Sequence, residues 1–185
     1  MTCRSSGDGN VLLVRYVAFL RAINVTTRRI KMTDLGDLFR GCGFDDVSTY
    51  IASGNVIFDS DSSPDLARIQ SVFEAEFGFA SEIFLRTSIQ IDELLRRVPW
   101  TSHDGVIEVS FLERPPPPES ARALEATAVP PEQLSVSGAE VFFLRAGTGT
   151  PTTHRESTSM RILDMKMSRR GLATVVKIRE KFLLV

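Results

Sequence analysis

The stretch VSTYIASGNVIFDS, residues 47–60, places β-branched and aromatic residues on both sides of a serine–glycine pair. This composition is typical of strands, and Ser53–Gly54 suits the tight turn of a β-hairpin. A second copy follows at 134–143, where LSVSGAEVFF carries Ser137–Gly138 at its centre. The hairpin pattern is therefore written twice in one chain of 185 residues.

The segments around the hairpins repeat as well. VRYVAFLRA at 14–22 matches VIEVSFLER at 106–114, and both predict buried strands. A helix with Thr33 as its expected N-cap follows the first strand, and Pro118 opens the corresponding helix in the second copy. We expect the last strand at 164–169. The pattern predicts an α+β fold of two tandem ferredoxin-like βαββαβ repeats with antiparallel sheets and an extra helix after each repeat.

The domain limits follow from this duplication. We expect a flexible tail at 1–10, a first repeat at 11–104, and a second repeat with a C-terminal helix at 105–185. The run RPPPP at 114–118 resembles a linker, but it stands between a strand and a helix of one repeat, which favours a loop. The sequence leaves open whether the two sheets pack on each other or join edge to edge.

The net charge of −1 hides an uneven distribution. Residues 15–31 carry five basic and no acidic side chains, and residues 151–185 carry eight basic and three acidic ones. Residues 32–150 carry eight basic and nineteen acidic side chains. The protein can form a basic face if the two basic segments meet. Taken alone, Arg169 and Arg170 are more typical of an exposed polar surface.

The loop after the first strand is the strongest candidate site. In this topology the end of the first strand lies beside the start of the third, which brings Arg21 and Asn24 toward the hairpin turn. A helix start nearby adds free N–H groups. We expect a binding module for an anionic ligand, either a phosphate-bearing small molecule or a nucleic acid. The candidate residues are Arg21, Asn24, Arg28, Arg29, Lys31, Ser53 and Asn55.

Two other interpretations remain. The loop can be an ordinary solvated segment in which Asn55 only shapes the turn. Alternatively, the protein is a small-molecule enzyme with its site in the cleft between the two repeats. His103 and His154 lack a neighbouring nucleophile motif, which weakens the case for a serine–histidine site. The hairpin also matches poorly the Gly- and Phe-dense signature of RNA-binding sheets.

Cys3 and Cys42 are the only cysteines, too few for a disulfide framework or a four-cysteine metal site, and we expect no metal and no cofactor. The apolar runs are shorter than the roughly 20 residues of a membrane span. The first ten residues are polar, unlike a signal peptide. We therefore expect a cytoplasmic protein without membrane association.

The strings YVAFLRAINVTTRRIKM and YIASGNVIF resemble a bacterial family known as domain of unknown function 1697, whose members typically read YVALLRGINVGG and YIQSGNVVF. RGLATVVKI at 170–178 lies where the family usually has RNWNTVLKL. The resemblance implies the two-repeat α+β fold and no agreed activity. This chain departs from the family pattern at Ala22, Thr26, Thr27, Thr153 and Leu172. A family site at these positions would be altered here.

Overall fold

The computed structural model describes residues 13–25, 29–101, 104–147 and 154–184, so the predicted tail at 1–10 lies outside it. The strands are β1 (Val14–Leu20), β2 (Asp45–Tyr50), β3 (Asn55–Ser60), β4 (Ile83–Thr87), β5 (Gly105–Phe111), β6 (Gln133–Ser137), β7 (Glu140–Ala146) and β8 (Ser168–Gly171). The helices are α1 (Met32–Gly41), α2 (Leu66–Phe77), α3 (Ser88–Arg96), α4 (Pro118–Glu125), α5 (Glu156–Leu163), α6 (Leu172–Ile178) and the π-helix η1 (Arg179–Leu183).

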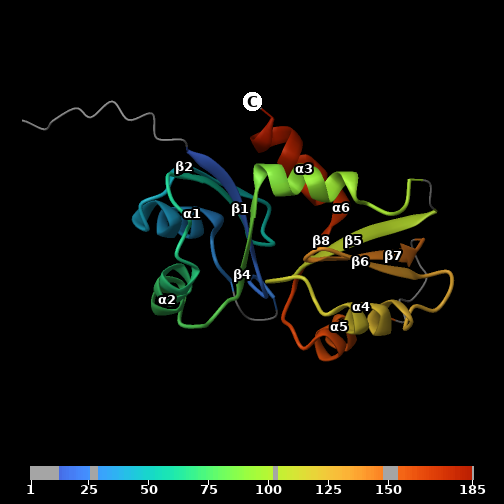
Figure 1. Cartoon of the computed structure of the whole chain (residues 1–185). Coiled ribbons are helices and arrows are strands. Elements are labelled where there is room, and N and C mark those ends of the chain that lie inside the picture. Colours follow the sequence, from blue (N-terminus) through green and yellow to red (C-terminus); the bar gives the residue numbers. More distant parts are fainter. Residues whose placement is uncertain (1–12, 26–28, 102–103, 148–153, 185) are drawn as a thin grey trace, which may run out of the picture.

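The strands form two four-stranded sheets of the same order. One sheet runs β2-β3-β1-β4 and the other β6-β7-β5-β8, with antiparallel neighbours throughout. Together with the element order this is consistent with two tandem ferredoxin-like repeats, which confirms the predicted fold class. The extra helices are also present, since α3 follows β4 and α6 follows β8 (Figure 1).

The two sheets pack on each other through their inner faces. On β1, Ala18 and Leu20 point into the core beneath α1 and α2, whereas Phe19 points toward the second repeat. Phe19 stacks on Phe111 of β5 with ring centroids 3.8 Å apart. Helices α3 and α6 contribute Ile91 and other apolar residues to the same central core, and α4 and α5 cover the outer face of the second sheet (Figure 1).

The two hairpins differ in the length of their turns. Four residues, Ile51 to Gly54, connect β2 to β3, whereas Gly138 and Ala139 alone connect β6 to β7. The register places Asn55 opposite Phe19 and Glu140 opposite Phe111. Asn55 and Glu140 are therefore structurally equivalent positions. Gly54 is required in its turn, because its φ is +80° and an added Cβ would lie 2.3 Å from the Ile23 side chain.

Two local predictions are wrong. Helix α1 begins at Met32 with Lys31 as its N-cap, because the Lys31 carbonyl already accepts the Leu35 N–H, so Thr33 lies inside the first turn. The last strand is β8 at Ser168–Gly171 rather than 164–169. Asp164 adopts a left-handed conformation that ends α5, and β8 pairs with β5 only from Ser168 onward.

None of the helices within the described residues has the length and apolar character needed to cross a membrane.

Candidate functional site

Arg170 of β8 reaches across the junction into the β2–β3 turn of the first repeat. Its guanidinium donates from Nε to Asn55 Oδ1 at 2.6 Å, and from Nη2 to the carbonyls of Leu20 at 2.9 Å and Ser53 at 2.7 Å. The side chain is buried, with 7% of its residue surface exposed. We call this set of contacts the Arg170 clamp; its remaining bonds go to Gly54 O, Ser168 Oγ and Arg169 O.

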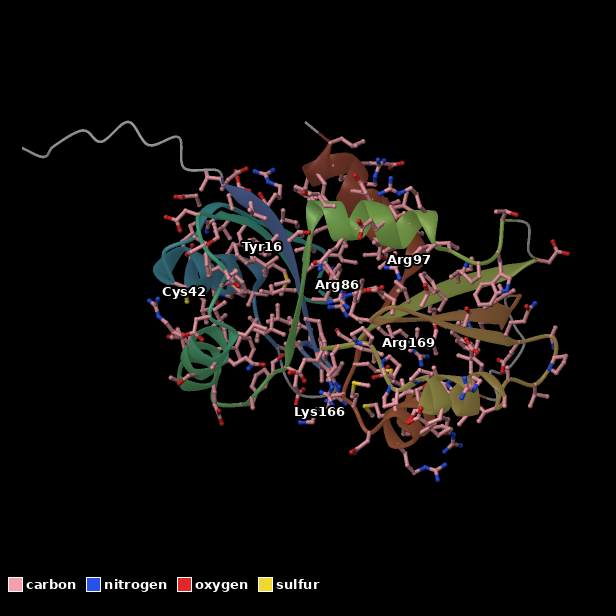
Figure 2. All side chains as sticks on the ribbon, viewed as in Figure 1. Tyr16, Cys42, Arg86, Arg97, Lys166 and Arg169 are labelled. Atoms are coloured by element: carbon pink, nitrogen blue, oxygen red, sulfur yellow. The ribbon has the colours of Figure 1, made fainter. Side chains whose placement is uncertain are left out.

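Arg86 of β4 makes equivalent contacts from the first repeat to the β6–β7 turn of the second repeat. Its Nε donates to Glu140 Oε1 at 2.7 Å, and its Nη2 donates to the carbonyls of Leu112 and Ala139 at 2.9 Å each. Glu140 also accepts a hydrogen bond from Arg97 at 2.7 Å. We call this set the Arg86 clamp; Arg86 and Arg97 lie where the two halves of the molecule meet (Figure 2).

A cavity of about 310 Å³ lies beside the Arg170 clamp. It brings Arg21 of the first basic segment together with Arg169 and Arg170 of the last one. The two basic segments therefore meet at the junction of the repeats. We call it the basic cavity; its lining is Leu20, Arg21, Ala22, Ile23, Val25, Ser53, Glu156, Met167, Ser168, Arg169 and Arg170.

A second cavity of about 430 Å³ occupies the corresponding place beside β4, between α2 and the segment after β5. Its charged residues include three acids and two bases, whereas the basic cavity has three arginines and one glutamate. We call it the mixed cavity, and it provides an internal control for the basic one. Its charged residues are Glu82, Glu113, Arg114, Asp164 and Lys166.

The arginines of the basic cavity differ in their partners. Arg21 Nη1 lies 3.3 Å from Glu82, and Arg169 Nη1 lies 3.2 Å from Glu108, so each of these arginines has a carboxylate partner of its own. The Nε atoms of Arg21 and Arg169 are buried without a hydrogen-bond acceptor among the described residues. Every hydrogen bond of Arg170 to the described residues ends on a neutral oxygen.

These surroundings shift two pKa values. Burial lowers the pKa of Arg170 to about 10, and the charge of Glu156 opposes this only in part. Burial alone would raise the pKa of Glu82, but the hydrogen bonds from Lys166 and Arg21 outweigh it and hold that pKa below its ordinary value. The positive charge of Arg170 is thus less well compensated than the negative charge of Glu82.

The structure brings some of the predicted residues to the cavity and leaves others apart. Arg21 and Ser53 line it. Asn55 lies behind Arg170, fully buried, and its amide also donates to Tyr50 O and Ser53 Oγ, which shapes the turn. Asn24 bonds Ile30 and Ala52 and closes the loop. Arg29 and Lys31 are exposed outside the lining, and Arg28, like Thr26, Thr27, His103 and Thr153, lies outside the described residues.

Sequence reasoning missed Ser168, Glu156, and the role of Arg169 and Arg170. The interpretation of Arg170 as an exposed surface residue is wrong, because it inserts between the repeats. The signal that could have found it is the duplication itself. Arg86 and Arg170 occupy equivalent places in the last strands, opposite Val17 and Val109 respectively.

His154 contacts a serine, but the two residues are closed off. His154 Nε2 lies 2.7 Å from Ser159 Oγ, and the exposed fractions of the two residues are 6% and 1%. Burial, and secondly the charge of Arg169, lower the pKa of His154. Neither residue belongs to the described lining of the basic cavity. The geometry therefore gives no accessible serine nucleophile at this pair.

The comparisons agree with the fold. The conserved bacterial protein SP0830 from Streptococcus pneumoniae has a solved structure that superposes with a TM-score of 0.75 at 22% sequence identity, covering 94% of this chain and 100% of that one. No curated protein matches this chain. The model of the family described as "Protein of unknown function (DUF1697)" matches residues 13–142. The chain belongs to this family.

Proposed function

We propose that this protein binds a small anionic ligand, of the phosphate-bearing class, in the basic cavity. The observation that carries the proposal is the convergence of Arg21, Arg169 and Arg170, from distant parts of the sequence, on one cavity at the junction of the repeats. Guanidinium groups suit phosphate because their donors match its oxygens in pairs. We retain a cytoplasmic location as part of this proposal.

The charge of Arg170 gives the reason for an anion. A buried guanidinium that donates only to neutral oxygens keeps a positive charge in a medium of low dielectric constant, and the charge of Glu156 compensates it only in part. An anion in the adjacent cavity would supply the missing negative charge and raise the pKa of Arg170 from about 10. The equivalent Arg86 already has Glu140 and gains nothing comparable.

The size of the cavity favours a small molecule over a nucleic acid. A volume of about 310 Å³ is at the lower end of the range of roughly 300–1,000 Å³ for ligand pockets. It accommodates a phosphate group with a compact body. A nucleic-acid strand needs an open groove with aromatic stacking platforms, whereas the described cavity lining consists of arginine, serine, glutamate, methionine and aliphatic residues. If the protein is instead an enzyme, its active site would occupy the same cavity between the repeats. We propose no reaction for this cavity.

The test is isothermal titration with inorganic phosphate, a simple phosphomonoester and a nucleotide. Arg21→Ala should weaken binding at least about tenfold, because a hydrogen bond to a charged group contributes roughly 1.5–3 kcal/mol. Arg114→Ala, in the mixed cavity, is the matched control and should leave binding unchanged. No binding of any probe at low salt, or equal losses in both variants, would contradict the proposal.

A parallel titration with single-stranded and duplex oligonucleotides separates the two ligand classes. Polyanion binding should weaken steeply with salt, by a slope of about 0.7 to 0.9 per phosphate contact on logarithmic axes. Tight, salt-sensitive oligonucleotide binding that small phosphates do not compete for would favour the nucleic-acid alternative.

A further inference from the structure

Glu156 is the one acidic residue in the described lining of the basic cavity. It is the first residue of α5, and 32% of its side-chain surface is exposed. Its nearest cationic atom is Arg169 Nε at 3.5 Å, where the pair forms no hydrogen bond. Among the hydrogen bonds of the described residues, none ends on its carboxylate. Glu156 therefore presents an unused acceptor beside three arginines.

A lone anion and Glu156 would oppose each other in this small space. Two negative charges within a cavity of about 310 Å³ repel more strongly than in bulk water, because the surrounding protein has a lower dielectric constant. A ligand with a cationic donor next to its anionic group removes that conflict. Its anion meets the arginines and its donor meets the glutamate.

We infer that the ligand is an amine-bearing phosphomonoester or a similar small zwitterion, whose ammonium group donates to Glu156 while its anionic group contacts Arg21 and lies beside the charge of the buried Arg170. This inference rests on the proposed function and adds to it the second recognition group of the ligand. Glu156 is then a specificity-determining residue. It selects against plain anions of the same size.

Glu156 can also act purely as a partner of Arg169. The two roles make different predictions about selectivity. A structural partner affects the stability of the protein, whereas a recognition group changes the ratio of affinities for two ligands that differ only in their ammonium group. The ratio cancels any general effect on the fold.

The experiment compares O-phosphoethanolamine with ethyl phosphate, a probe with the same phosphomonoester and no amine. The wild-type protein should bind phosphoethanolamine roughly fivefold more tightly, the scale of one partly exposed charge pair. Glu156→Gln should reduce this preference to about onefold and should strengthen binding of ethyl phosphate, because the repelling charge is gone. Glu156→Asp, which keeps the charge on a shorter chain, should retain part of the preference. Glu113→Gln, in the mixed cavity, is the control and should leave the preference unchanged.

The two proposals fail in different ways. Equal binding of both probes by the wild type, or a preference that survives in Glu156→Gln, overturns the role of Glu156 and leaves anion binding standing. If neither probe binds and inorganic phosphate also fails, both proposals are overturned. Thermal unfolding of each variant shows whether the fold is retained, so that a loss of affinity is interpreted only in a folded protein.

Discussion

The Arg86 clamp and the Arg170 clamp make nearly the same hydrogen bonds, but only the Arg86 clamp contains a carboxylate. Each arginine bonds the first residue of a strand, the carbonyl before that residue, and the carbonyl of a leucine at the end of the first strand of the other repeat. The partner of Arg86 is the carboxylate of Glu140, whereas the partner of Arg170 is the amide oxygen of Asn55. The repeats are held together twice by one geometry, and only the Arg86 clamp contains a carboxylate.

This difference separates what holds the fold from what is available for a ligand. Glu140 has Arg86 and Arg97 as partners, so the first clamp is complete within the protein. The second keeps a buried cation beside a cavity with two further arginines. The basic cavity is thus a candidate site for an electrostatic reason that its pseudo-symmetric counterpart does not share.

The largest effect is expected when the Arg86 clamp is broken. Arg86→Met should lower the free energy of unfolding by about 3–5 kcal/mol, because it leaves Glu140 and two carbonyls buried with fewer partners. Chemical denaturation measures this loss. Arg97→Met, at the exposed edge of the same clamp, should cost less than about 1 kcal/mol. A similar cost for both variants would show that burial of Arg86 does not matter.

Breaking the Arg170 clamp should cost less. Arg170→Met removes hydrogen bonds to several buried oxygens, but it also removes a cation that burial disfavours, as its lowered pKa indicates. We expect a loss of about 1–3 kcal/mol in the free energy of unfolding together with a loss of anion binding. If Arg170→Met is as damaging as Arg86→Met, the missing carboxylate carries no energetic weight and the comparison fails.

The partners can also be exchanged between the clamps. Asn55→Asp gives Arg170 a carboxylate, and we expect anion affinity to fall about tenfold, equivalent to about 1.4 kcal/mol, as the cavity is neutralised. Glu140→Gln is the matched change at the Arg86 clamp and should leave anion affinity unaltered. Titration with inorganic phosphate compares the two. Unchanged binding in Asn55→Asp would show that the charge of Arg170 does not contribute to anion affinity.

The fold was largely predictable because its signals are local and written twice. The hairpin strings around Ser53 and Ser137, with the matching strands before them, are sufficient to give the strand order. The face-to-face packing was not predictable, since β1 is apolar on both faces and either face could have met solvent, a helix or another sheet. Phe19 and Phe111 stack only because of how the repeats pack.

The site was predictable only for residues whose proximity follows from strand order and register. Arg21 and Ser53 come together because β1 ends where β3 begins. The amides of Asn24 and Asn55 are used inside the loop and turn, which sequence cannot distinguish from ligand contacts. Arg170 was missed because a charged residue in a strand gives no sign of burial until the partner sheet is placed.

Backbone strain at the basic cavity gives a smaller prediction. Ala22, in the lining of the basic cavity, has φ of +54°, where the family resemblance has glycine. Ala22→Gly should raise the free energy of unfolding by about 0.5–1 kcal/mol, since glycine adopts this conformation without a Cβ clash. Ala123→Gly, on the exposed face of α4, is the control and should lower it by about 1 kcal/mol. Denaturation of both variants checks the opposite signs, and equal signs would contradict the assignment of strain to Ala22.

The smallest effect tests whether the basic side is short of negative charge. Burial and the charge of Arg169 lower the pKa of His154, while Glu132 opposes them. The unfolded chain, whose histidine titrates near 6.5, therefore binds more protons than the folded protein as pH falls through this value. The free energy of unfolding should accordingly be fully retained above that pH and decrease below it.

An anion bound beside Arg169 offsets the positive charge that His154 experiences. The pKa of His154 should then rise, and the acid-side loss of stability should become smaller in the presence of phosphate. NMR titration of the His154 ring between about pH 7.5 and about pH 5.5, the window in which histidine titrates, measures this shift with and without phosphate. In Arg169→Met the same addition of phosphate should move the His154 pKa less. If phosphate leaves that pKa unchanged in the wild type, no anion is held beside Arg169, and the asymmetry between the two clamps is a feature of the fold alone.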